Sequence, residues 1–220
     1  GGSGGGGGSS EDTVAPIVSS TNPVNGAIDV VINQKISVIF SEAMSTGSLT
    51  TATFTLKKGA TVVSGTVTCV DRTATFDPTG HLSDDTLYTA KITTGVTDLA
   101  GNHLAVTKTW TFTTGATPDT TNPVVSSTNP IDTATGVAIN WSPTATFSEA
   151  MDPATITGIT YTLMEGVNPV VGDVSSLGSV ATFNPTSDLA EGTLYTATIE
   201  TGVTDLAGNP LAVTKTWTFT

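Results

Sequence analysis

The sequence predicts an all-β protein built from two tandem antiparallel β-sandwiches, and two observations lead to this conclusion. First, residues 95–113 return as residues 202–220 with one residue changed, and the same offset of 107 (from 95 to 202) carries 12–113 onto 119–220 without a gap. Self-similarity at a fixed period is the signature of tandem modules. Second, short runs of Val, Ile, Thr and Phe are broken by Gly, Pro, Asn and Asp at roughly the eight-to-twelve-residue spacing of sandwich strands.

The repeat divides the chain into four parts. We expect a flexible Gly/Ser tether over residues 1–11, a first module over 12–114, a short connection over 115–118 and a second module over 119–220. Each module has about 100 residues, which is enough to bury a core of its own. We therefore expect each module to fold independently, without sharing strands with its neighbour.

Alternating apolar residues locate the strands of the first copy. Ile36, Val38 and Phe40 point one way along the first core strand, as the period of two residues requires. Tyr88 stands at the head of a later strand, where it is either an ordinary buried tyrosine or a corner residue whose hydroxyl binds upstream backbone. The expected strands are 16–20, 36–40, 53–57 (Phe54 and Leu56 inward), 62–70, 73–76, 87–93 and 104–113 (Val106, Trp110 and Phe112 inward), with a corner over 41–44 that can hold one helical turn.

Charge and cysteine content exclude several classes of partner. The net charge is −12, and the second module has Lys215 as its only basic residue, so anionic nucleic acid and anionic membrane surfaces would repel the chain. This charge also favours a monomer. Cys69 is the only cysteine and Ser176 occupies its place in the second copy, so the module has no disulfide. No apolar run approaches the ~20 residues of a membrane helix.

The first ten residues, GGSGGGGGSS, contain no side chain that could be buried in a core. Such a segment acts as a flexible tether. It is similar to the Gly/Ser spacer that follows the lipidated cysteine of mature bacterial lipoproteins, which implies a lipid anchor ahead of Gly1. An expression linker is the alternative interpretation.

Comparison of the copies argues against catalysis. His81 and His103 have Asp188 and Pro210 as counterparts, so the module has no repeated His or Cys ligands for a transition metal. No motif places a base beside an activated Ser or Cys. We therefore predict a protein that is not an enzyme and needs no cofactor.

Three acidic residues do recur, and they lie far apart in the sequence. They are the pairs Asp12/Asp119, Glu42/Glu149 and Asp98/Asp205. For Glu42 and Asp98 we expect hydrogen bonds to loop amides at strand corners. Asp119 lies at the junction between the modules and is the candidate for a calcium ion that would stiffen the hinge.

Trp141 is the one aromatic residue that breaks the pattern. It replaces Gln34 in the second copy, whereas other aromatic residues fall mostly on inward positions. Either Trp141 packs in the core of the second copy alone, which we expect, or it is an exposed contact for a ligand.

A set of motifs in fixed order resembles a known family. Asn-Pro is followed by FSEAM, by ATFDP or ATFNP, by LxxxTLYT, by GVTDLAGN and by WTFT in both copies. This order is similar to that of the bacterial Ig-like domain found in surface-layer and other exported bacterial proteins. The resemblance covers 12–114 and 119–220 and implies Ig-like sandwiches of about seven strands, located outside the cell and lacking catalytic residues.

These observations predict a cell-surface spacer of tandem Ig-like modules that projects a further ligand-binding domain, beyond Thr220, from the bacterial envelope. The lipid anchor would make it an outer-membrane lipoprotein. The alternative is an adhesin whose modules themselves bind a glycan, a surface or a protein. The connection over 115–118 is short, and Pro118 and Pro123 restrict it, so we expect the modules to stand end to end as a stalk.

Overall fold

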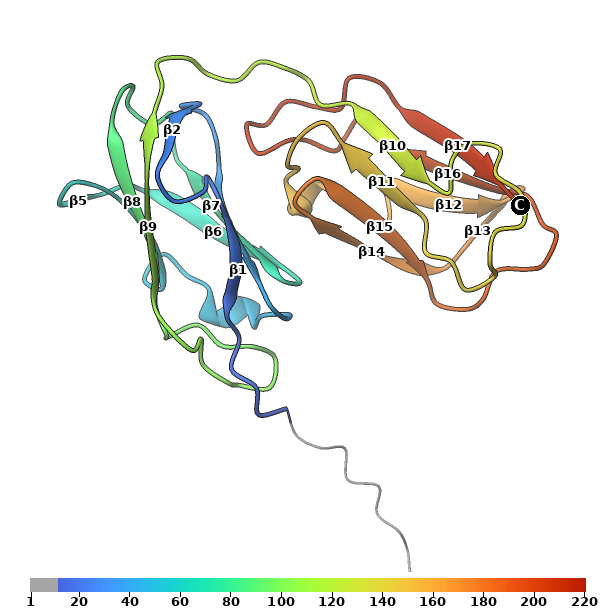
Figure 1. The fold of residues 1–220 in the computed structure, drawn as a ribbon, viewed down its shortest axis with the longest axis horizontal. Helices are drawn as coiled ribbons and strands as arrows, with labels where there is room; N and C mark the ends of the chain where they lie inside the picture. Colours follow the sequence, from blue (N-terminus) through green and yellow to red (C-terminus); the bar gives the residue numbers. More distant parts are fainter. Residues whose placement is uncertain (1–11) are drawn as a thin grey trace, which may run out of the picture.

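The computed structural model describes residues 12–220, and the first module is a sandwich of two sheets (Figure 1). All strand pairs are antiparallel except β2 with β9. One sheet has the order β1 (Val18–Asn22), β3 (Ile36–Phe40), β7 (Thr73–Pro78), β6 (Gly65–Val70); the other has the order β2 (Ala27–Val30), β9 (Lys108–Thr114), β8 (Leu87–Ile92), β4 (Phe54–Lys58), β5 (Thr61–Val62).

The second module repeats this topology. Its equivalent of β2 is reduced to a single parallel bridge between Ala134 and Phe219. The only helical segments in residues 12–220 are two short 3₁₀ turns, η1 (Thr46–Ser48) and η2 (Pro153–Thr155). The sheets have the orders β10 (Val125–Asn129), β11 (Thr144–Phe147), β15 (Val180–Pro185), β14 (Gly172–Leu177) and β13 (Asn168–Pro169), β12 (Tyr161–Glu165), β16 (Tyr195–Ile199), β17 (Lys215–Phe219).

Each module has its own core between its sheets. Ile36, Val38 and Phe40 are fully buried, as the alternation predicted. The ring of Phe54 packs against Phe76 and Trp110, with centroids 5.7 and 5.9 Å away. In the second module the buried residues form a separate cluster, so neither core uses a residue of the other module. The prediction of two all-β Ig-like sandwiches is confirmed.

The closing strand is shorter than the sequence indicated. We expected it to begin at Leu104 and to bury Val106, but β9 begins at Lys108 and Val106 is 73% exposed. Leu104 is buried from a loop instead, where its N–H donates to the carbonyl of Val96. The corner over 41–44 contains no helical turn; the 3₁₀ turn η1 follows it.

The structure decides between the two interpretations of Tyr88. Its hydroxyl accepts a hydrogen bond of 2.8 Å from the backbone N–H of Ser83, five residues upstream. Tyr195 accepts the equivalent bond of 2.7 Å from the N–H of Ala190. Each tyrosine therefore ties a loop to the sheet while its ring stays in the core, as a corner residue does.

The expectation that the modules stand end to end is wrong. In Figure 1, β1, β8 and β9 of the first module run nearly vertically, whereas β10, β12 and β17 of the second module run across to the right. The end of the second module that includes Met151 and η2 packs near Ser37 and Thr73, on the outer face of the β1–β3–β7–β6 sheet. The short connection does limit the distance between the modules, but contacts between side chains and backbone decide their direction, and the proline pattern carries no information about those contacts.

Candidate functional site

The three recurring acids come together in space in both modules. Asp12, Glu42 and Asp98 each offer an oxygen within 4.8 Å of the others, and so do their counterparts Asp119, Glu149 and Asp205. Strand β3 ends at Phe40, and Met44, which follows it in the corner that carries Glu42, forms a bridge to Asp98. Residues that are some 30 to 90 positions apart in the sequence therefore meet at one end of each sandwich.

The aspartate of the TDLAGN loop is the buried member of each cluster. One oxygen of Asp98 accepts a hydrogen bond of 2.8 Å from the N–H of Asn102, and the other accepts one of 2.8 Å from the Asn102 side-chain amide. Burial alone would raise the pKa of Asp98, but these bonds, with those from Gly101 and Ala100, lower it. Asp98 is therefore held as a carboxylate, and the expectation that it binds loop amides is confirmed.

The glutamate of each cluster is in the opposite electrostatic situation. Burial, followed by the charges of Asp12 and Asp98, raises the pKa of Glu42. For Glu149, burial and the charges of Asp205 and Asp119 raise the pKa in the same way. Among the described residues, no backbone amide donates to Glu42, so the expectation that it caps a loop is not met. Each glutamate adds negative charge that its neighbours oppose.

Three carboxylates at this separation favour a bound cation or a shared proton. Their oxygens are hard ligands of the type that Ca²⁺ prefers, and no His or Cys takes part in either cluster. The donor set therefore fits calcium better than zinc. Whether calcium binds at Asp119 stays a prediction.

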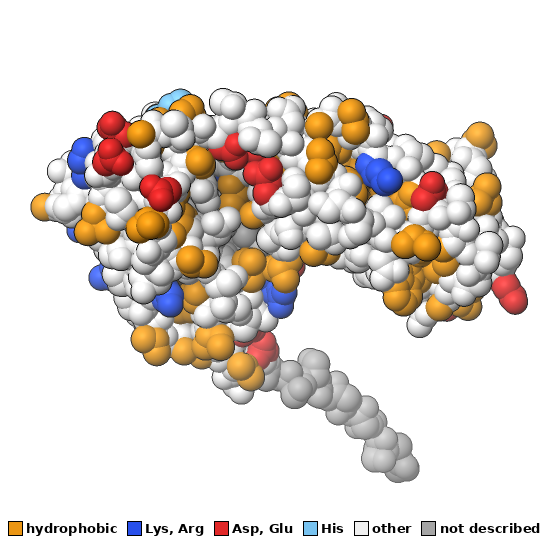
Figure 2. Space-filling view, turned by 45° about the horizontal axis from the view of Figure 1, so that its top comes forward, with side chains coloured by type: hydrophobic (Ala, Val, Ile, Leu, Met, Phe, Trp, Pro, Cys, Tyr) orange, Lys and Arg blue, Asp and Glu red, His pale blue; other side chains and the backbone are white. Residues whose placement is uncertain are grey.

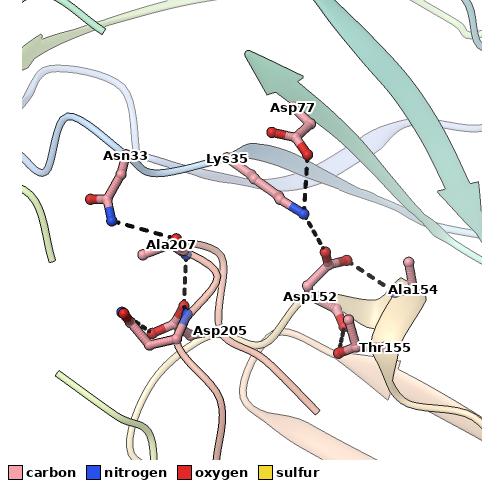
Figure 3. A network of polar contacts seen from close by, with 9 residues as sticks. Asn33, Lys35, Asp77, Asp152, Ala154, Thr155, Asp205 and Ala207 are labelled. Atoms are coloured by element: carbon pink, nitrogen blue, oxygen red, sulfur yellow. Dashed lines mark hydrogen bonds and ion pairs between the residues drawn. The ribbon is translucent and has the colours of Figure 1, made fainter. Parts of the chain in front are cut away.

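Asp119 lies at the junction of the modules, where its backbone forms hydrogen bonds with the side chain of Asn33. Figure 3 shows Asn33 and the neighbouring loop. The Asn33 amide donates to the carbonyl of Asp119 at 2.8 Å, and its oxygen accepts from the N–H of Asp119 at 2.7 Å. The same amide also donates to the carbonyl of Ala207 at 3.4 Å. One side chain thus joins the first module to two segments beside the second cluster.

An ion pair makes the second contact of the junction (Figure 3). The Lys35 ammonium lies 2.7 Å from a carboxylate oxygen of Asp152 and 3.2 Å from one of Asp77. Burial lowers the pKa of Lys35, but the bonds and charges of Asp152 and Asp77 outweigh it and raise the pKa above 10.5. The N–H of Lys35 also donates to the carbonyl of Leu206 at 2.8 Å. The junction is therefore held by specific polar contacts.

Sequence comparison missed this ion pair. The counterpart of Lys35 is Ser142 and that of Asp152 is Ser45, so a comparison that looks for recurring residues finds neither. A signal was present, since a lysine and an aspartate each appear in one copy only, on the two sides of the connection.

Aromatic side chains do not form an exposed platform. All are buried except Trp141, which is 38% exposed and donates to the carbonyl of Asn129 at 3.5 Å, so the expectation that it packs in the core is wrong. A groove of about 580 Å³ near it is lined partly by Val137, Ile139 and Leu189. On the face in Figure 2, acidic side chains are spread over both modules, with a group where the modules meet.

A family model for the bacterial Ig-like domain matches residues 12–114 and again residues 119–220. The chain belongs to the bacterial Ig-like domain family. A search of curated proteins finds no match. None of the helical segments in residues 12–220 is long and apolar enough to cross a membrane.

A search of solved structures finds matches to surface-layer proteins and to an Ig-domain complex. The N-terminal part of the bacterial S-layer protein SbsC is 15% identical with a TM-score of 0.37, over 94% of this chain and 44% of that one. Domains 1–6 of the surface layer protein SbsC are 15% identical with a TM-score of 0.39, and the match covers 91% of this chain and 34% of that one. Dpr2 Ig1–Ig2 in complex with DIP-Theta Ig1–Ig3 is 8% identical with a TM-score of 0.28, and the match covers 94% of this chain and 98% of that one. The chain spans less than half of these S-layer chains.

Proposed function

We propose that this chain is a non-catalytic spacer on the bacterial cell surface, in which two Ig-like modules hold a further ligand-binding domain at a fixed distance and angle from the envelope. The docked junction carries this proposal. Asn33 and Lys35 fix the second module on the first through bonds to backbone and to a nearly buried carboxylate. A spacer needs such a joint, because two freely jointed modules would not define a position.

The family supports the same function. The chain consists of two bacterial Ig-like domains, and the similar S-layer chains are surface proteins by their names. Anchoring through a lipid ahead of Gly1 is part of the proposal; the tether that would carry it lies outside the described residues. An adhesin role for the modules themselves is less favoured, because Trp141 is a lone exposed aromatic residue.

Small-angle X-ray scattering tests the spacer. We expect one fixed arrangement of the two modules to fit the scattering curve, at low and at high salt, because the Asn33 bonds to backbone do not depend on screening. Leu206→Asp, which puts a charge into the docked surface, should produce a curve that only an ensemble of arrangements fits. If the unmodified chain also requires an ensemble, the rigid-spacer proposal fails.

Calcium at the carboxylate clusters is the second part of the proposal. Because the pKa of Glu149 is raised, its charged form destabilises the calcium-free folded state at neutral pH, and stability should increase as pH falls through this raised pKa towards 4.5. Calcium should remove the same penalty at neutral pH, with a gain of about 2.7 kcal/mol at a concentration 100 times its Kd.

Thermal unfolding with calcium and with chelator checks this. We expect Glu149→Gln to be at least as stable as the unmodified protein in chelator and to lose the gain from calcium in the second module. Glu165→Gln, an exposed glutamate outside the cluster, should keep the full gain. If calcium leaves the melting temperature of the unmodified chain unchanged, neither cluster holds the ion, and the spacer proposal is unaffected.

A further inference from the structure

The repeat provides an internal comparison for the junction. The residues of each module that form the junction have counterparts in the other module, 107 positions away. The first module docks through its loop over 31–35, and the matching loop of the second module is 138–142. The second module docks through Asp119, Asp152 and the loop over 205–207, and the matching surface of the first module consists of Asp12, Ser45 and 98–100.

The leucine of the TDLAGN loop shows what docking changes. Leu206 is 4% exposed because it lies against the loop that includes Val31 and Gln34, whereas its counterpart Leu99 is 76% exposed. The two loops have the same sequence from Gly95 to Asn102 and from Gly202 to Asn209, so the difference in exposure comes from their surroundings. Leu99 is an apolar residue presented in the geometry that Leu206 uses in the junction.

The other half of the junction is exposed at the far end. Ile32, Asn33 and Gln34 are half-buried, and their counterparts Ile139, Asn140 and Trp141 are all exposed. Asn140 is the same residue type as Asn33, whose side-chain amide forms hydrogen bonds with the backbone of Asp119. The two ends therefore carry the apolar contact and the amide contact of the junction, each without its partner among the described residues.

The Lys35–Asp152 ion pair shows whether the two outer surfaces could meet without a charge mismatch. A copy of the junction that kept only Lys35 or only Asp152 would bury an unpaired charge, which is costly. At the outer ends both partners are replaced together, by Ser142 and Ser45. The outer surfaces can therefore meet without an uncompensated charge at this place.

We propose that these two ends form a second junction of the same kind between two copies of this chain, with the far end of one copy docked on Asp12, Leu99 and Ala100 of the next. The contact is head to tail, so repeated association builds an open chain of molecules, or a ring where the rotation between successive copies closes. It goes beyond the spacer function, because it makes the protein a unit of a larger assembly.

The interaction should be weaker than the internal junction for two reasons. The connection over 115–118 brings the modules of one molecule together, whereas two copies must meet by diffusion. Asp71 also stands where Gly178 lines the internal contact, so a carboxylate faces the partner. The chain should therefore be a monomer when dilute, in agreement with its charge, and associate as its concentration rises.

Cross-linking tests the geometry. In a Cys69→Ser background, which copies Ser176, one chain carries Ala100→Cys and another carries Ala138→Cys. These positions are the counterparts of Ala207 and Val31, which line the same cavity of the internal junction, and the Val31→Cys/Ala207→Cys chain is the positive control. A short bis-maleimide should link the mixed pair many-fold more than either chain with itself. A chain carrying Val62→Cys, on the edge strand β5, is the control for random collisions.

Sedimentation measures the association itself. The average mass should rise above 22.2 kDa with concentration; Leu99→Asp should abolish the rise, and Val62→Asp should leave it. Ser45→Asp with Ser142→Lys, which recreates the ion pair, should tighten association several-fold, while each alone should weaken it. A mass that stays at 22.2 kDa at millimolar concentration, or cross-linking no greater than with Val62→Cys, overturns the proposal and leaves the spacer function untouched.

Discussion

Replacing Phe112 by alanine should cost about 3–5 kcal/mol of the stability of the first module, the usual cost of a cavity left by a buried aromatic ring. Phe112 is fully buried in the middle of β9, and its ring stacks on that of Tyr88 with centroids 5.7 Å apart. Removing the ring also leaves Tyr88 without its neighbour, although the hydroxyl of Tyr88 would still hold Ser83.

Urea denaturation of the full chain measures this loss. Because the cores are separate, Phe112→Ala should shift the transition of the first module, and Phe219→Ala should shift that of the second by a similar amount. Thr109→Ala, at an exposed position of β9, is the matched control and should change stability by less than about 0.5 kcal/mol. A loss below about 1 kcal/mol for Phe112→Ala would mean that this ring does not fill the core.

Replacing Lys35 by methionine should weaken the docking of the modules by up to about 3 kcal/mol without unfolding either. The substitution leaves the carboxylate of Asp152, of which 5% of the side chain is exposed, without its cation, although the N–H of Ala154 still donates to it at 3.0 Å. The methionine keeps most of the length of the lysine, so the loss reports the charge rather than the packing.

A double-mutant cycle separates the interaction free energy of Lys35 with Asp152 from the effect of each substitution alone. Lys35→Met with Asp152→Ser should recover much of the docking lost by Lys35→Met alone, because no buried charge is left unpaired. The pKa of Lys35 is raised above 10.5 in the folded protein, so its contribution is present below that pH and is lost as pH rises through the raised value. Scattering or NMR shifts at the junction follow the docking in each case; docking of Lys35→Met equal to that of the unmodified chain would show that the pair contributes nothing.

The fold could be predicted from the sequence because the alternation of apolar residues is a local pattern and because it occurs in both copies of the repeat. Alternation of Ile36, Val38 and Phe40 identifies a buried face whatever the neighbouring strand is. The β9 boundary was missed because Leu104 and Val106 continue the alternation outside the strand, where one is buried by a loop and the other is exposed. Periodicity does not separate these two cases.

The candidate site was only partly predictable. The recurrence of Asp12, Glu42 and Asp98 in the second copy was visible, yet their convergence depends on which strand ends share one end of the sandwich, and this is a property of the topology. The junction depends on Asn33 and Lys35, whose partners Asp119 and Asp152 belong to the other module. Contacts between modules with separate cores leave no periodic pattern in either one.

The bent docking also has a mechanical consequence. When the two ends of the chain are pulled apart, the load reaches the junction before it separates any pair of strands, because the modules meet through a few side-chain bonds, whereas β8 and β9 share a ladder of six residue pairs. Opening the bend lengthens the molecule while both sandwiches stay folded, and the connection over 115–118 keeps the modules close enough to dock again. We therefore expect the joint to open under load before either core does.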